Sequence, residues 1–297
     1  MIHIANAPVS WGIFEFEGTA QQYTYQQVMD QIAATGYTGM ESGPWGFLPT
    51  DTDLMLSELA ARKLSLLSAF VPCNFADAAA LDAAEAHALK VGRYLAALGA
   101  VCVVLADDNG KVPELVKHAG RRTGSALSND QWDTYAAGVN RVARTLFDAT
   151  GLKVTFHHHG AGYVETPEEV RRLLARTDAD LVGLCLDTGH YHFGGGDAVE
   201  AIREFGARVR YLHLKDCDLG IRDLAKHEKM DYFATTAAGV FCELGKGAVD
   251  FPGILSAMEA LGYQGWAIVE QDILVDDLDA PRQSAARNRD YLRKLGY

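Results

Sequence analysis

The sequence has no long apolar run, few cysteines and a shortage of positive charge, and each lack excludes a class of protein. No apolar run approaches the roughly 18 residues that a membrane-spanning helix needs, so we expect no membrane partner. The opening residues, MIHIANAPVSWG, contain neither the basic segment nor the long apolar segment of a secretion signal, which favours a cytoplasmic location. The net charge is −12, whereas a nucleic-acid partner would need a basic surface.

The five cysteines are scattered, odd in number and free of CxxC spacing. Disulfide frameworks and zinc or redox motifs show the opposite pattern, so we expect reduced thiols. Cys102 and Cys185 lie inside apolar runs and are expected in the core. A glycine-rich phosphate loop is also missing after the first apolar run, and Gly194–Gly196 lacks the GxGxxG spacing. This argues against an open, doubly wound sheet.

The chain does contain apolar, β-rich runs that alternate with stretches of helical period. The runs are continuous rather than alternating, which is typical of strands buried on both faces. The predicted strands are Ile2–Ala5, Tyr37–Glu41, Leu64–Phe70, Val101–Leu105, Lys153–His157, Val182–Asp187, Val209–Leu214 and Trp266–Glu270. The predicted helices are Tyr25–Ala34, Asp51–Arg62, Ala78–Leu98, Asp130–Thr150, Pro167–Ala175, Asp197–Phe205, Phe251–Leu261 and Ala280–Leu295.

This alternation without a linker predicts an α/β fold, a (β/α)8 TIM barrel, as one domain over residues 1–297. Two capping-box patterns support the helix starts, Ser128 with Gln131 and Thr166 with Glu169. Glycines near helix ends support the stops: Gly36, Gly99, Gly151 and Gly262. Two long loops, Ala106–Ser128 and Asp216–Asp250, are expected on the active face, where they would act as lids.

Acidic and imidazole side chains occur where the later strands end. Asp187 ends the sixth strand in LDTGH, His213 lies near the end of the seventh in HLKD, and Glu270 ends the eighth in IVEQD. The carboxyl ends of barrel strands meet at one face, and a buried carboxylate there is costly unless a cation accompanies it. We therefore predict that Asp187, His213 and Glu270 bind one divalent metal ion. With one further ligand, this set suits Mn²⁺, Co²⁺, Mg²⁺ or Zn²⁺.

The identity of the fourth ligand stays open, because the fifth strand ends in three histidines, FHHHG. Neighbouring side chains of a strand point to opposite faces, so His157 and His159 share one face and His158 takes the other. His157 is one candidate for the fourth metal ligand. Glu165, at the end of the following loop, is the other, although an acidic residue there also suits the first turn of the next helix.

A metal at this face would polarise a carbonyl group, and proton transfer next to that carbonyl would need protein groups. The candidate catalytic residues are those expected at the mouth of the barrel: His157, His159, Glu165, Lys215 and Glu41. Lys215 reads most simply as a solvated charge, but a nearby metal would lower its pKa into a useful range. His190 is expected to orient Asp187 or to touch substrate, and Asp272 is expected to be peripheral.

Segments spread over almost the whole chain resemble one known family: NAPVSWG, GYTGMESGPWGFLPTD, HHHGAGYVETPEEV, LCLDTGHYHFGGGD, YLHLKDCD, ELGKGAVDF and GYQGWAIVEQD. They are similar to the xylose-isomerase-like barrels and, within them, to the inosose dehydratases of inositol catabolism. The resemblance implies one divalent metal on the C-terminal face, usually Mn²⁺ or Co²⁺, with Asp187, His213 and Glu270 at three ligand positions. The wider family has a glutamate as its strand-five ligand, where this chain has His157, with Glu165 as the substitute.

The leading hypothesis is a lyase that dehydrates a keto-cyclitol such as 2-keto-myo-inositol (inosose) through a metal-stabilised enediolate. A keto-sugar isomerase or epimerase would use the same site, and the motifs do not separate the two. Cleavage of phosphodiesters, as in endonuclease relatives of this fold, is disfavoured by the charge of −12. A metal-free binding barrel remains an alternative, because fold alone does not fix function. The expected partner is a small polyol or keto-cyclitol, and a homo-oligomer is compatible with this reading.

Overall fold

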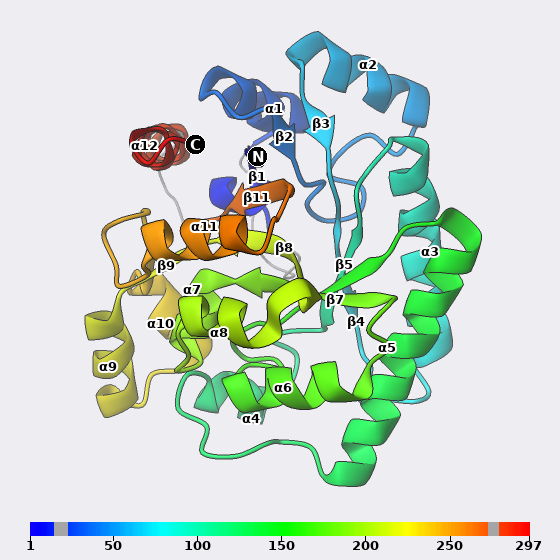
Figure 1. The fold of residues 1–297 in the computed structure, drawn as a ribbon, viewed down its shortest axis with the longest axis vertical. Coiled ribbons are helices and arrows are strands. Elements are labelled where there is room, and N and C mark those ends of the chain that lie inside the picture. The colour runs from blue at the N-terminus through cyan, green and yellow to red at the C-terminus, as the bar shows by residue number, and fades with distance from the viewer. Residues whose placement is uncertain (15–22, 273–278) are drawn as a thin grey trace.

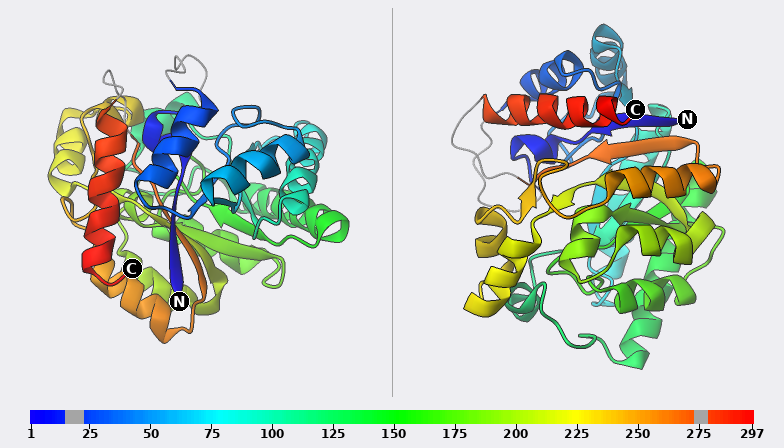
Figure 2. Two further views of the ribbon diagram at one scale, coloured as in Figure 1. Left: turned by 90° about the horizontal axis from the view of Figure 1, so that it is seen from above. Right: turned by 60° about the vertical axis from the view of Figure 1, so that its left-hand side comes forward.

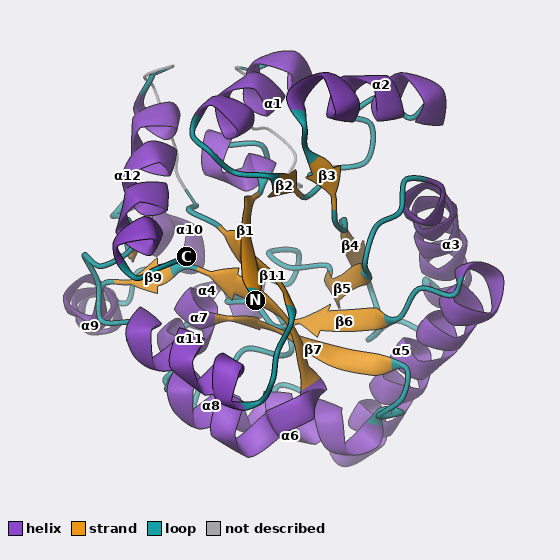
Figure 3. Ribbon diagram, turned by 45° about the horizontal axis from the view of Figure 1, so that its top comes forward, coloured by secondary structure: helices purple, strands orange, loops and turns teal. Residues whose placement is uncertain are grey.

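The computed structural model describes residues 1–14, 23–272 and 279–297. Within them, parallel strands form one curled sheet in the order β3-β2-β1-β11-β8-β7-β6-β5-β4. Figure 3 shows these strands in the centre with helices around them. The bounds are β1 Ile2–Asn6, β2 Gly39–Met40, β3 Ser65–Leu66, β4 Phe70–Cys73, β5 Val103–Asp107, β6 Val154–His157, β7 Val182–Asp187, β8 Val209–Leu214 and β11 Gly265–Val269.

The sheet closes into a barrel through the segment between β3 and β4. The predicted strand Leu64–Phe70 spans β3, this segment and the first residue of β4. β3 pairs with β2 and β4 pairs with β5, both in parallel. Between them, Leu67 N donates a hydrogen bond to the Met40 carbonyl of β2 (3.0 Å), and the Ala69 carbonyl accepts one from Val104 N of β5 (3.1 Å). The linking residues therefore bond to both neighbouring strands, and the predicted α/β TIM barrel is confirmed.

Helices cover the outside of the sheet, and each predicted helix is present with small shifts at its ends (Figure 1). Both predicted capping boxes form, because the Ser128 and Thr166 side chains accept from the backbone N–H groups of Gln131 and Glu169. The bounds are α1 Tyr25–Ala34, α2 Thr52–Arg62, α3 Leu81–Ala97, α5 Asn129–Thr150, α6 Pro167–Arg176, α8 Ala198–Phe205, α11 Phe251–Ala260 and α12 Ala280–Lys294. No described helix is both long and apolar enough to span a bilayer.

The last helix completes the outer layer beside the first one. Figure 2 shows α12 lying next to the N-terminal part of the chain. The Tyr37 hydroxyl donates to the Ala285 carbonyl (2.9 Å), and Arg289 Nε donates to the Gly36 carbonyl (3.1 Å). These contacts join the two ends of the chain around the barrel.

The barrel interior is a packed core and not a channel. A separate cluster of buried side chains fills it, and this cluster includes both cysteines expected in the core. Its members are Ala5, Ala7, Leu67, Cys102, Val104, Cys185, Tyr211 and Ile268. Such layers of inward-pointing side chains are the usual filling of an eight-stranded barrel, and they form the floor beneath its mouth.

The two long loops contain short elements that the sequence reading did not predict. The first holds α4 (Pro113–His118), and the second holds β9 (Asp216–Cys217), α9 (Leu219–Glu228), α10 (Tyr232–Ala237) and β10 (Phe241–Cys242). Arg121 joins the loops, since its guanidinium donates to the Met230 carbonyl (2.5 Å). Three further short helices are η1 (Pro8–Trp11), α7 (Thr188–Phe193) and η2 (Gly206–Arg208).

Candidate metal centre

Four side chains from the ends of four strands meet at the mouth of the barrel. His157 ends β6, Asp187 ends β7, His213 lies in β8, and Glu270 follows β11 directly. One nitrogen or oxygen atom of each lies within 4.8 Å of those of the others. His213 Nδ1 is 3.1 Å from Glu270 Oε2, and His157 Nε2 is 3.5 Å from Asp187 Oδ2. The structure thus brings together the three predicted ligands and His157.

Several atoms of this four-residue group are buried without a hydrogen bond of normal geometry in the described part of the chain. They are His157 Nδ1 and Nε2, Asp187 Oδ2 and His213 Nδ1. Leaving such atoms without a partner costs about 1–3 kcal/mol each. Two imidazoles and two carboxylates that converge with free lone pairs fit a divalent cation of the Mn²⁺, Co²⁺ or Zn²⁺ type.

Glu41, which follows β2, holds the imidazole of His213 in a definite orientation through its Nε2 atom. Glu41 Oε1 lies 3.1 Å from His213 Nε2 and accepts a second hydrogen bond from Ser68 Oγ (2.7 Å). Ser68 Oγ in turn lies 2.8 Å from the Tyr211 hydroxyl. When His213 donates through Nε2 to the carboxylate, its Nδ1 presents a lone pair to the group, as in the carboxylate–histidine pairs that support metals. Glu41, predicted as a catalytic candidate, therefore contacts a candidate metal ligand, and it also lines the pocket.

Asp187 is oriented by the turn that follows β7. Its Oδ1 accepts from His190 N (2.8 Å) and caps the short helix α7, which leaves Oδ2 facing the group. The Asp187 backbone N–H donates to His158 Nε2 (3.3 Å). His158 therefore points away from the mouth, as strand alternation predicts, and supports the end of β7.

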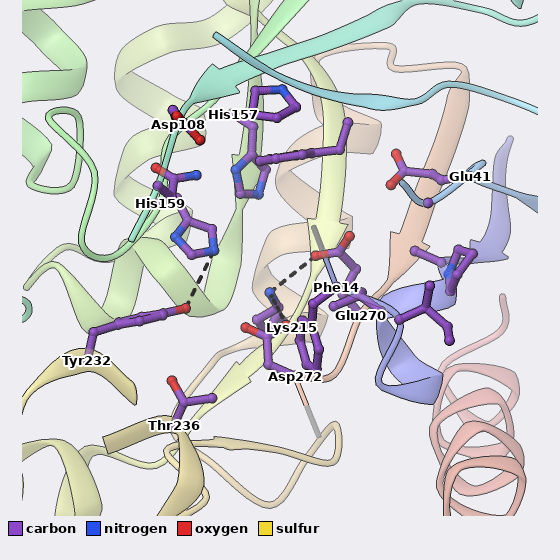
Figure 4. A pocket seen from close by; sticks show the side chains of 18 of the residues that line it. Phe14, Glu41, Asp108, His157, His159, Lys215, Tyr232, Thr236, Glu270 and Asp272 are labelled. Atoms are coloured by element: carbon purple, nitrogen blue, oxygen red, sulfur yellow. Dashed lines mark hydrogen bonds and ion pairs between the residues drawn. The ribbon is translucent and has the colours of Figure 1, made fainter. Parts of the chain in front are cut away.

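Lys215, just after β8, is buried and not a solvated charge. Its Nζ lies 2.9 Å from Asp272 Oδ1 and 3.2 Å from Glu270 Oε2, two contacts drawn in Figure 4, and 3.3 Å from Asp187 Oδ2. Burial alone lowers the pKa of the amine, but the three carboxylates outweigh burial, and the pKa of Lys215 is raised well above its ordinary value. The expectation of a peripheral Asp272 is wrong, because Asp272 is buried against Lys215.

A second group lies beside the first and consists of His159, His190 and Asp272, whose ligand-type atoms also lie within 4.8 Å of one another. The rings of His159 and His190 have centroids 3.9 Å apart. The Tyr232 hydroxyl of α10 lies 3.5 Å from His159 Nε2, as Figure 4 shows. Burial, together with the charge of His157 and Lys215, lowers the pKa of His159 to about 3, so its imidazole is neutral.

Glu165 does not belong to either group, which argues against it as the fourth ligand. Its buried carboxylate accepts hydrogen bonds from Gly120 N (2.8 Å) and Ala161 N (2.9 Å) and lies 3.6 Å from Arg122 Nε. It precedes the N-cap Thr166, so it does not lie in the first turn of α6 either. Glu165 thus joins two loops, a long-range role that its sequence context does not reveal.

A cavity of about 500 Å³ opens above the four-residue group. The β1 end and β4 give it an apolar side formed by Ala7, Pro8, Val9, Phe70 and Pro72. The opposite side is polar and comes largely from the two long loops, with Asp108, Asn109, Lys111, His159, Tyr232 and Thr236. Neither Trp11 nor Trp45 is among the residues that line the cavity.

Asn109 is a polar pocket residue that the sequence reading missed. It is buried, and neither atom of its side-chain amide has a hydrogen-bond partner among the described residues. The neighbouring Gly162 leaves room for it, because a Cβ there would lie 2.4 Å from Asn109 Oδ1. An unpaired amide in a cavity is suited to the hydroxyl groups of a ligand.

A closed parallel barrel with buried His, Asp and Glu side chains at the carboxyl ends of its strands defines the class of barrel enzymes with a metal-type site. Residues 29–295 match the family described as "Xylose isomerase-like TIM barrel", and the chain belongs to this family. The resemblance found in the sequence motifs is thereby confirmed.

The similarity to individual proteins extends over nearly the whole chain. An inosose dehydratase of Geobacillus thermodenitrificans is 29% identical over 99% of this chain and 97% of its own length. Among solved structures, the IOLI protein with a bound zinc atom superposes with a TM-score of 0.74, at 15% identity and with 99% of both chains covered. An L-ribulose 3-epimerase gives a TM-score of 0.70 at 18% identity, covering 99% of this chain and 94% of its own. At such identities the two structures show the fold alone.

Proposed function

We propose that the protein is a metal-dependent hydro-lyase that dehydrates a keto-cyclitol such as 2-keto-myo-inositol. The observation that carries this proposal is the buried group of His157, Asp187, His213 and Glu270, whose ligand-type atoms converge at the mouth. The end-to-end similarity to an inosose dehydratase supports the choice of reaction. The cavity of about 500 Å³ is of a size suited to a small polyol.

The four residues of this group would hold the divalent metal, with Mn²⁺ or Co²⁺ as the favoured ion and Mg²⁺ or Zn²⁺ as alternatives. When bound, the metal supplies Lewis-acid polarisation of the substrate ketone. Glu41 keeps the imidazole of His213 in the orientation that a ligand needs. Asn109, with its unpaired amide, binds a ring hydroxyl and orients the substrate across the cavity.

We assign the proton transfers of a dehydration to two neighbouring groups of the chain, His159 and Lys215. His159 Nδ1 lies 2.5 Å from the Gly160 carbonyl and so carries the imidazole proton, which leaves Nε2 as the acceptor. The neutral His159 accepts the proton alpha to the ketone, and the ammonium of Lys215 donates toward the departing beta hydroxyl, which leaves as water. Such proton transfers contribute about 10²–10⁴-fold each to a rate.

The alternative is a keto-sugar isomerase or epimerase, which would use the same buried group of ligand-type side chains. Both reactions begin by removing the proton alpha to the ketone. They differ in the next step, because an epimerase returns a proton to carbon while a dehydratase releases a hydroxyl. In D₂O, substrate that gains deuterium and keeps all of its hydroxyls would favour the epimerase.

The deciding experiment incubates the protein with Mn²⁺ and 2-keto-myo-inositol. We expect a diketone lighter than the substrate by one water, detected by mass spectrometry, and no product after treatment with a chelator and gel filtration. Readdition of Mn²⁺ or Co²⁺ should restore the product. Absence of a dehydrated product with each of the four divalent metals would overturn the proposal.

A further inference from the structure

Lys215 occupies a position that has the contacts of a cation site. Its Nζ has carboxylate oxygens of three residues at 2.9–3.3 Å and His190 Nε2 at 3.1 Å. Asp272 and His190 belong to the second group, while Asp187 and Glu270 belong to the first. The amine therefore lies between the two groups, in contact with ligand-type atoms of both.

The DTGH turn after β7 is built to hold this amine in place. Thr188 Oγ1 donates to the Lys215 carbonyl (2.7 Å) and accepts from the Lys215 backbone N–H (3.0 Å). Gly189 makes room for the lysine stem, since a Cβ there would lie 2.6 Å from Lys215 Cγ. The Phe241 ring lies 5.2 Å from Nζ. Lys215 is thus fixed along its whole length.

The negative charges around Lys215 also require a cation at the position of its amine. Three buried carboxylates surround the amine, those of Asp187, Glu270 and Asp272, and a fourth, that of Glu41, is buried next to His213. With one divalent ion in the first group and the ammonium of Lys215 in place, the four carboxylates carry one negative charge more than the cations balance. Without the ammonium, two negative charges remain, and a second divalent ion would cancel them. Uncompensated buried charge is strongly unfavourable, so some cation must occupy the position.

We propose that Lys215 is a built-in cation that fills a second metal site and thereby limits the protein to one divalent ion. The latent site consists of His159, His190 and Asp272. Asp187 and Glu270 would bridge it to the first ion, as carboxylates do where two metals lie about 3.5–4 Å apart. This inference rests on the proposed function, because it takes the first group as a metal site.

The test compares metal content in four proteins after saturation with Zn²⁺ and removal of free metal. We expect one ion per chain in the wild type and two in Lys215→Ala, in which both the charge and the stem are gone. Lys215→Met removes the charge but fills the space, so it should hold one. The double variant Lys215→Ala/Asp272→Asn should return to one, because the latent site loses a ligand.

A spectroscopic readout separates a paired site from adventitious binding. Loaded with Mn²⁺, the wild type should give the EPR signal of an isolated ion, and Lys215→Ala the signal of an exchange-coupled pair. Should Lys215→Ala fail to fold, Lys215→Ser opens the same space and must also hold two ions. One ion in the folded Lys215→Ala or Lys215→Ser variant, or two in the wild type, would overturn this inference and leave the proposed function standing. A wild type that binds no divalent ion would instead overturn both.

Discussion

The ends of β5 and β7 carry the same residue in opposite electrostatic situations. Asp107 and Asp187 are each the last residue of their strand, and both are buried. Burial raises the pKa of Asp107 to about 6, and its hydrogen bonds offset only part of this rise. Burial acts in the same direction on Asp187, but the charges of Lys215 and His190 and the contact with His157 outweigh it and lower the pKa.

The difference teaches that a buried acid at a strand end does not by itself mark a site. Asp107 accepts from the Tyr135 hydroxyl and from Tyr163 N (2.7 Å) and Val164 N (3.2 Å), and so it fastens a loop to the barrel. Asp187 instead has imidazoles and an amine around it. The neighbouring amine and imidazoles, and not burial, distinguish the candidate ligand Asp187 from the structural acid Asp107.

The largest expected effect comes from replacing Asp187, at the end of β7, by asparagine. Asp187→Asn should lower activity by about 10³-fold, equivalent to ~4 kcal/mol, because the metal group loses a charged ligand. Glu270→Gln should do the same while leaving the fold largely intact. Metal content and turnover of 2-keto-myo-inositol measure the effect.

Asp107→Asn is the matched control, since it makes the same chemical change at the end of β5. It should keep the wild-type metal content. If Asp107→Asn lost its metal and Asp187→Asn kept it, the assignment of the two carboxylates would be reversed.

The second prediction concerns stability, and its sign follows from the raised pKa of Asp107. The folded protein holds the proton of the Asp107 carboxyl more tightly than the unfolded chain does. Protonation of Asp107 therefore stabilises the fold fully below pH ~3.8, and this stabilisation is lost as pH rises through about 6. The free energy of unfolding of the wild type should fall relative to Asp107→Asn by ~3 kcal/mol between these limits. Urea unfolding of both proteins from pH 4 to pH 7 measures it, and parallel curves would contradict it.

The smallest effect is expected behind the metal group, where Glu41 orients His213. Glu41→Ala should weaken metal affinity by about 10–100-fold, as removal of such outer hydrogen bonds does. Glu41→Gln keeps an oxygen acceptor and should recover part of the loss. Competition with a chelator of known affinity measures both variants. Equal affinities for Glu41→Ala and the wild type would show that His213 needs no support.

Much of the barrel could be predicted, because strands buried on both faces leave continuous apolar runs. β7 and β8 have the predicted bounds, and α1 matches its prediction at both ends. The short helices in the long loops were missed, since a helix such as α4 (Pro113–His118) offers less than two turns of periodicity. Their shape depends on contacts with segments distant in sequence, such as that of Arg121 with Met230 and that of Arg222 with His192.

The candidate site was predictable where a single strand end delivers a side chain and unpredictable where partners come from distant segments. His157, Asp187, His213 and Glu270 stand at strand ends, which converge in any such barrel. Whether an acid nearby joins them depends on loop geometry. Glu165 lies eight positions after His157, yet it is bound by Gly120 and Arg122, and no local pattern indicates this pairing.

The pairing of β11 has a consequence for how the protein matures. β11 lies between β8 and β1, with Gly265 opposite Ile2, so the ring cannot close before nearly all of the chain has been synthesised. Glu270 arrives with this final strand. A chain that lacks β11 thus offers three of the four side chains of the proposed metal site, and tight binding of an ion would require the segment that carries Glu270.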